Sequence, residues 1–245
     1  MIRLNNIHKH FGDTEILKGI DLEINQGEII VIIGSSGTGK STLLRCVNFL
    51  EQADQGSIQI DDVIVDTAKH SKAEVLALRR KTAFVFQNYA LFAHMTARQN
   101  IAEGLITVRG WTKKAALEKA QQILDNIGLS DKGDSYPAAL SGGQQQRVGI
   151  GRAMALQPEL LLFDEPTSAL DPEWVGEVLQ LMKQLATQHQ TMLVVTHEMQ
   201  FAKEVADRVI FMADGHIVEQ GSPQELFDNP QDPRLQKFLN QVSAK

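Results

Sequence analysis

Residues 34–41 have the sequence Gly34-Ser35-Ser36-Gly37-Thr38-Gly39-Lys40-Ser41, which fits the pattern G-x-x-x-x-G-K-[ST] at every fixed position. Glycines let such a loop turn so that successive backbone N–H groups point inward at nucleotide phosphates. Lys40 would place its ammonium group on the β and γ phosphates, and Ser41 would offer its hydroxyl to Mg²⁺. We add the next residue, Thr42, to the nucleotide-binding positions of this phosphate loop.

The sequence on either side of the phosphate loop supports this interpretation. The run from Glu28 to Ile33 is almost wholly apolar, as expected for a strand buried on both faces of a parallel sheet. Residues 42–47 have a helical pattern, and the positive end of that helix would face the same anion. The alternative is a glycine-rich turn without a ligand, which would not require a strand before it and a helix after it.

A second apolar run ends in two carboxylates. Residues 160–163 are Leu-Leu-Leu-Phe, and Asp164 and Glu165 follow directly. Ligands gather at the carboxyl ends of parallel strands, so we expect Asp164 beside Ser41, as an oxygen ligand for Mg²⁺. Glu165 would polarise the attacking water as a general base. Two acids in an ordinary turn before Pro166 are the alternative.

Two further polar residues follow apolar runs of strand type. His197 comes after the run 192–196, where it could bond the γ-phosphate or the attacking water. Gln87 comes after the run 83–86. Each residue alone would indicate little, because a lone polar residue at a strand end is more often structural.

Leu140-Ser141-Gly142-Gly143-Gln144-Gln145-Gln146-Arg147 is the most discriminating stretch of the chain. A serine N-cap and two glycines open a helix here, which makes a second anion site. One chain therefore carries two phosphate-binding devices far apart in sequence. Gly149 and Gly151, in the same helix, have no role in this prediction.

Together these motifs resemble the nucleotide-binding domain of ATP-binding cassette (ABC) transporters, and the resemblance covers essentially the whole chain. Six motifs occur in the family's order. They are the phosphate loop at 34–41, Gln87 (the Q-loop), Leu140 to Gln144 (the signature), Leu160 to Glu165 (the Walker B strand), Ser168 to Asp171 (the D-loop) and His197 (the H-loop).

The resemblance implies an α/β fold. It consists of a P-loop NTPase core with a mostly parallel sheet, an N-terminal antiparallel β subdomain and an inserted α-helical subdomain. The patterns agree, since residues 1–33 are strand-like, 56–66 suggest a hairpin and the middle third is mostly helical. We expect one domain over 1–245, with its core at 1–87 and 156–245 and the helical subdomain at about 88–155.

The resemblance also implies that ATP is shared between two chains packed head to tail. The phosphate loop of one subunit and the signature of the other would hold each nucleotide, which explains the doubled anion sites. The signature residues contacting the γ-phosphate are then Ser141, Gly142, Gly143 and Gln144, with Asp171 along the interface. Phe11 corresponds to the residue that stacks on adenine, and Gln87 joins Ser41 and Asp164 at Mg²⁺.

Composition restricts the possible partners. The chain has 245 residues and a net charge of −6, which argues against a surface built mainly for nucleic acid. The longest apolar runs are far shorter than the roughly 20 residues of a membrane span, so we expect membrane association only through a partner protein. The single cysteine, Cys46, cannot form an intrachain disulfide, and this fits a reducing compartment.

Several stretches resemble the polar amino-acid uptake group of bacterial importers, among them Ser168 to Glu173, Thr196 to Met199 and Val205 to Met212. That resemblance implies a place on the cytoplasmic face of the inner membrane. A groove near Gln87 to Thr96 would receive the integral membrane permease subunits. An extracytoplasmic solute-binding protein would act indirectly and help choose the substrate, cystine or another polar amino acid.

Two alternatives remain at this stage. A cassette ATPase that transports nothing would share the motifs. The DNA-repair and chromosome types carry long coiled coils, and no sustained heptad repeat occurs here, but a cluster-assembly ATPase is harder to separate. A small-molecule kinase could use the same phosphate loop, although the signature has no role in that chemistry.

Overall fold

The structure is a computed structural model that describes residues 1–243. Its larger sheet has six strands in the order β10-β9-β3-β8-β7-β6. All neighbouring pairs are parallel except β9 and β10, so the mostly parallel sheet expected from the sequence is confirmed. The strands are β3 (Ile29–Ile33), β6 (Thr82–Val85), β7 (Leu160–Asp164), β8 (Met192–Val195), β9 (Arg208–Ala213) and β10 (His216–Gly221).

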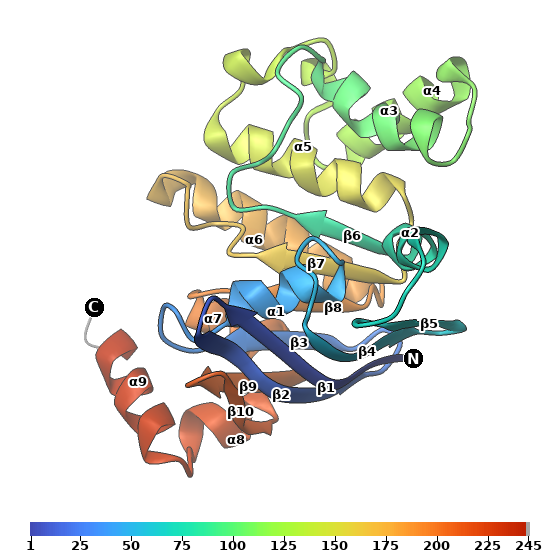
Figure 1. The fold of residues 1–245 in the computed structure, drawn as a ribbon. Helices are drawn as coiled ribbons and strands as arrows, with labels where there is room; N and C mark the ends of the chain where they lie inside the picture. Colours follow the sequence, from blue (N-terminus) through green and yellow to red (C-terminus); the bar gives the residue numbers. More distant parts are fainter. Residues whose placement is uncertain (244–245) are drawn as a thin grey trace.

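A smaller antiparallel sheet lies beside it, with four strands in the order β2-β1-β4-β5 (Figure 1). Its members are β1 (Ile2–Phe11), β2 (Thr14–Ile24), β4 (Gln55–Ile60) and β5 (Val63–Asp66). Gly12, at a φ of +58°, lies in the turn between β1 and β2. The β4–β5 pair is the hairpin predicted for residues 56–66, so the antiparallel subdomain joins the N-terminal hairpin to a later one.

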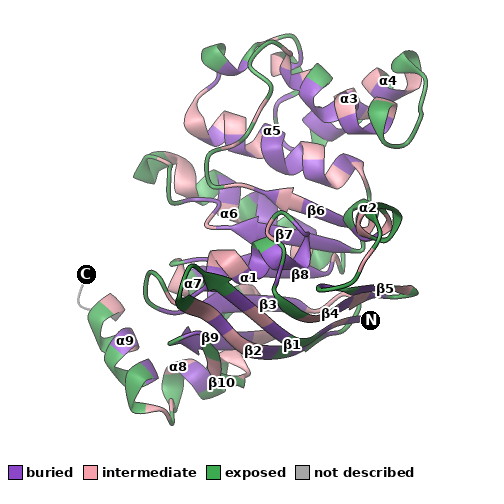
Figure 2. Ribbon diagram, viewed as in Figure 1, coloured by how far each residue is buried: buried purple, intermediate pink, exposed green. Residues whose placement is uncertain are grey.

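The core divides into two clusters, one on each face of β3. Val31 points into one cluster, while Ile30 and Ile32 point into the other, as the alternation of a strand requires. All five residues of β3 are buried, which Figure 2 shows as continuous purple along the central strands. The continuous apolar run that predicted a doubly covered strand therefore has the expected environment.

Helices cover both faces of the larger sheet. One cluster of the core contains residues of α1 (Lys40–Val47) and α2 (Lys72–Lys81) together with the smaller sheet. The other cluster contains residues of α6 (Pro172–Thr187), α7 (Met199–Val205), α8 (Pro223–Asp228) and α9 (Pro233–Ser243). Within residues 1–243, no helix has both the length and the apolar composition needed to cross a bilayer.

The middle of the chain forms a helical layer beyond β6, at the top of Figure 1. It comprises α3 (Ala97–Thr107), α4 (Lys113–Asn126), the short 3₁₀ helices η1 (Ser130–Lys132) and η2 (Pro137–Ala139), and α5 (Gly142–Ala155). The predicted apolar face of α4 packs inward through Ala120 and Leu124, and Gly128 follows the helix at a φ of +70°. The layer brings the start of α5 near the end of the sheet that carries the site.

Candidate functional site

The phosphate loop connects β3 to α1, and two of its glycines are required by geometry. Gly34 has a φ of +147°, and a Cβ there would lie 2.3 Å from the Met212 carbonyl oxygen. Gly39, the N-cap of α1, has a φ of +95°, and its Cβ would lie 2.9 Å from Leu17. Side chains at these positions would displace the loop, so the motif glycines fit their predicted backbone role.

Lys40 is the first residue of α1, and its side chain is turned back under the loop. Its Nζ donates hydrogen bonds of 2.8 Å to the carbonyl oxygens of Gly34 and Ser35. Burial lowers the pKa of Lys40, while the nearby carboxylates of Glu165 and Asp164 act in the opposite direction. The loop thus holds a positive charge that is largely shielded from water.

Ser41 and Asp164 meet although 123 residues separate them in sequence. The Ser41 hydroxyl donates to Asp164 Oδ1 at 2.6 Å, and Arg45 lies 3.5 Å from the other carboxylate oxygen. Asp164 is buried at the end of β7. A hydroxyl and a carboxylate are oxygen ligands of the kind that Mg²⁺ binds, so this pair fits the metal expected from the sequence.

Glu165 and His197 form a second pair, at 3.0 Å between Glu165 Oε1 and His197 Nε2. The hydrogen bond from His197 lowers the pKa of Glu165, against the opposing effect of burial. Glu165 has a left-handed φ of +47°, and its N–H donates to the Val195 carbonyl oxygen. The carboxylate is therefore ionised at neutral pH and held in one direction, as a general base requires.

Lys40, Ser41 and Glu165 line an open depression of about 290 Å³, and two residues that do not line it, Asp164 and His197, are bonded to Ser41 and Glu165. Phe11 lies at its edge with half of its surface exposed, and Lys9 Nζ is 4.9 Å from the centre of its ring. Ile16, on the second strand of the same hairpin, was not predicted, because only the fold places it here. The residues that line the depression are Phe11, Ile16, Ser36, Gly37, Gly39, Lys40, Ser41, Thr42 and Glu165.

Other predicted site residues do not line this depression in the single chain. Gln87 is exposed two residues beyond β6, and Asp171 is exposed at the N-cap of α6. At the start of α5, the Ser141 hydroxyl accepts from the Gln144 N–H at 3.3 Å, and the Gln144 side chain accepts from the Ser141 N–H at 3.0 Å. The signature is thus a helix N-terminus capped by its own residues, and none of its residues lines the depression.

Comparison with known proteins decides the family. The profile of the ABC transporter family matches residues 17–168. The chain is 55% identical to a probable amino-acid import ATP-binding protein, YxeO, of Bacillus subtilis (strain 168), over 99% of this chain and 97% of that protein. It is 54% identical to the L-cystine import ATP-binding protein TcyC of the same organism, over 99% of this chain and 98% of that protein.

The chain belongs to the ABC transporter family. It is an ATPase of the cassette type, which confirms the enzyme class predicted from the six motifs. Among solved structures it is similar to the ATP-binding cassette MJ0796 in a dimeric post-hydrolysis state bound to ADP and Pi. The TM-score is 0.80 at 34% identity, over 91% of this chain and 99% of that one, and it confirms the fold.

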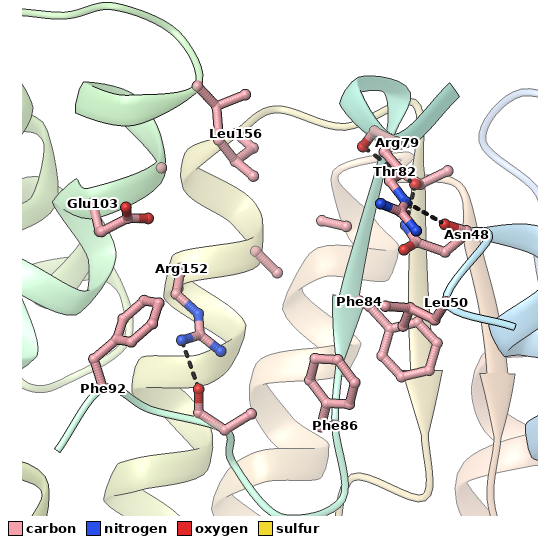
Figure 3. Close-up of a pocket in the computed structure, with 15 residues that line it drawn as sticks. Asn48, Leu50, Arg79, Thr82, Phe84, Phe86, Phe92, Glu103, Arg152 and Leu156 are labelled. Carbon is pink, nitrogen blue, oxygen red and sulfur yellow. Dashed lines mark hydrogen bonds between the residues drawn. The ribbon is translucent and has the colours of Figure 1, made fainter. Parts of the chain in front are cut away.

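This cassette has a larger cavity, about 430 Å³, that lies apart from the phosphate loop (Figure 3). Phe84 of β6 and Phe86, just after that strand, line one side of this groove, and Phe92 and Arg152 line the other. The Arg152 guanidinium lies 5.7 Å from the ring centre of Phe92 and donates to the Ala90 carbonyl oxygen at 2.8 Å. The groove is therefore mainly aromatic and aliphatic, with two arginines, Arg79 and Arg152, and the carboxylate of Glu103 in its wall.

The structure accounts for Gly149 and Gly151, two glycines of α5 for which the sequence indicated no role. A Cβ on Gly151 would lie 3.0–3.2 Å from Ile123, Ile127 and Ile101, so α5 packs tightly on α3 and α4 at this point. A Cβ on Gly149 would lie 3.3 Å from the Tyr89 carbonyl oxygen. Both glycines allow the loop and helices that surround α5 to approach it closely.

Proposed function

We propose that this chain is the ATP-hydrolysing subunit of a bacterial ABC importer for polar amino acids, and that it works as a head-to-tail dimer. The observation that carries the proposal is that Lys40, Ser41 and Glu165 line one depression, with Asp164 bonded to Ser41 and His197 bonded to Glu165. The import functions named for YxeO and TcyC support the transport class. Since cystine is named for one of these relatives only, the proposal stops at the class of polar amino acids.

Each residue of the depression would perform one step of phosphate binding or water activation. The loop amides and Lys40 bind the β and γ phosphates, and Phe11 supports the adenine ring. Ser41, Asp164 and Gln87 would together hold Mg²⁺. The bound ion would neutralise negative charge on the phosphates. Glu165 accepts a proton from the attacking water, and His197 keeps the carboxylate oriented toward it.

The signature would complete the site of a second copy of the chain. The signature offers the N-terminus of α5, formed by Ser141, Gly142, Gly143 and Gln144. A helix N-terminus favours an anion, here the γ-phosphate of ATP bound to the partner chain. Asp171, at the neighbouring N-cap of α6, would run along the same interface. The dimeric state of MJ0796 supports this two-fold arrangement, in which one surface pairs with its own copy.

The groove beside β6 would receive a segment of the integral membrane permease, near the loop from Gln87 to Thr96. Its aromatic lining suits an amphipathic helix. The chain would then act at the cytoplasmic face of the inner membrane, with a solute-binding protein acting indirectly and no nucleic-acid partner. We further propose the division into a core at 1–87 and 156–245 and a helical subdomain at about 88–155, supported by the layer of α3, α4 and α5.

The substitution Glu165→Gln tests the proposal. It keeps the shape of the side chain but removes the base, so we expect ATP binding to persist and hydrolysis to fall by about 10²- to 10⁴-fold. The ATP-bound dimer should then accumulate in size-exclusion chromatography with light scattering. Glu159→Gln, just before the opposite end of the same strand, is the control and should hydrolyse ATP as the parent does. An active, monomeric Glu165→Gln protein would contradict the assignment.

A further inference from the structure

The loop after Gln87 contains two consecutive residues in a left-handed backbone conformation. Tyr89 has a φ of +56° and Ala90 a φ of +49°, although neither is glycine. Such residues are uncommon and persist only where the surroundings hold them. Arg152 of α5 does so here, because its guanidinium donates to the carbonyl oxygens of Ala90 at 2.8 Å and Tyr89 at 3.4 Å. The loop is thus tied to the helix that begins at the signature.

The side chain of Tyr89 reaches two other segments. Its hydroxyl donates to the carbonyl oxygen of Ala169 in the D-loop at 3.1 Å. The same hydroxyl lies against the signature, where a Cβ added to Gly142 would be only 2.7 Å away. Burial, followed by the charge of Asp171, raises the pKa of Tyr89, so the hydroxyl remains a donor at neutral pH. One hydroxyl therefore touches the D-loop and the signature from the loop of Gln87.

We propose that Tyr89 is a positioning residue that fixes the D-loop and the signature relative to the loop of Gln87 within one subunit. The inference rests on the proposed head-to-tail dimer, in which Gln87 serves the subunit's own nucleotide while the other two segments face the partner's. A displacement of Gln87 is then carried directly to the surface that pairs. The hydroxyl also orders that surface before pairing, which lowers the entropy lost on association.

The experiment measures pairing in the hydrolysis-blocked Glu165→Gln protein as MgATP is titrated, with analytical ultracentrifugation as the readout. Tyr89→Phe removes one hydroxyl and keeps the ring. Loss of one such hydrogen bond changes an equilibrium constant by about two- to tenfold. We therefore expect the MgATP concentration for half-maximal pairing to rise by about two- to tenfold. Tyr136→Phe is the matched control, since Tyr136 is the chain's other tyrosine and is half-exposed. It should pair as the parent does.

Two further measurements separate positioning from a general loss of stability. The affinity of the monomer for a fluorescent ATP analogue should be the same in Tyr89→Phe and Tyr136→Phe. The thermal midpoint of Tyr89→Phe should fall by only about 2–4 °C, the effect of one hydrogen bond lost within the subunit. Identical pairing curves for the two tyrosine variants would overturn the inference, and so would a pairing defect fully matched by weaker monomer binding. If the Glu165→Gln parent itself never pairs in MgATP, the proposed function fails instead.

Discussion

The phosphate-loop depression and the start of α5 both present groups suited to phosphate, yet they are assembled differently. In the depression, bonds join distant parts of the chain, as between Ser41 and Asp164 or between His197 and Glu165. At the start of α5, the side chains of Ser141 and Gln144 bond each other's backbone N–H groups, within one turn of helix. The first region is assembled from groups distant in sequence within one chain, whereas the second, in the proposed dimer, would complete the site of the partner chain.

This difference suggests that the first region binds the nucleotide and that the second acts when two chains pair. A depression whose charges are oriented in advance can bind a nucleotide with little reorganisation. The N-terminus of α5 would contribute to phosphate binding only when a second molecule supplies the anion. Substitutions of the phosphate-binding residues in the first region should therefore weaken binding by the monomer, whereas substitutions in the second should weaken pairing without changing that binding.

The largest effect is expected for Lys40→Ala. The buried ammonium would make charge-assisted hydrogen bonds to the phosphates, so its loss should weaken binding of a fluorescent ATP analogue by more than about a hundredfold. Lys114→Ala, at an exposed lysine of α4, is the control. Undiminished affinity in Lys40→Ala would remove the contrast between the two regions.

A smaller and more selective effect is expected for Ser141→Ala in the Glu165→Gln background. Monomer affinity for ATP should not change, while the MgATP concentration for half-maximal pairing should rise by about tenfold or more, since a bond to a charged phosphate is lost. Ser222→Ala removes the same kind of capping box, with Glu225 in α8, and serves as the matched control. Both variants should lose about 1 kcal/mol of stability. Equal pairing in the two would place the signature outside the interface.

The smallest effect concerns how firmly α5 is held. Gly151→Ala should destabilise the fold by about 1–2 kcal/mol, because overpacking against three isoleucines outweighs the gain in helix propensity. Gly176→Ala, in α6, meets nothing within 4 Å and should stabilise by about 0.5–1 kcal/mol. Urea unfolding of the two variants measures this. A stabilised Gly151→Ala would mean that α5 packs more loosely than the structure shows.

Much of the fold and of the depression followed from local sequence. Continuous apolar runs predicted β3 and β7, and their meeting at one sheet edge predicted that Asp164 would reach Ser41, as the 2.6 Å bond confirms. Helix α2 was not predicted, because only Leu78 among its residues is buried and no apolar face repeats. The capping box of Ser71 and Glu74 was the available signal.

Contacts that depend on tertiary packing could not be predicted. Ile16 lines the depression only because its hairpin passes over the phosphate loop, and the Tyr89 hydroxyl meets Ala169 across 80 residues of sequence. Gly151 had no role that the sequence could indicate, and only the packing of three isoleucines around it shows why a larger residue does not fit. The proposed roles of Gln87 and the signature need a nucleotide and a second chain to test them.

The left-handed backbone of Glu165 has a consequence for evolution and engineering. A residue with a Cβ in this conformation costs about 1–2 kcal/mol, which glycine would avoid. Selection for thermal stability alone would therefore favour glycine or asparagine at position 165. Under the proposed role of Glu165, the resulting proteins would be more stable but would not hydrolyse ATP. If glutamate is retained at this position in evolution, the selected property is ATP hydrolysis and not the stability of the fold.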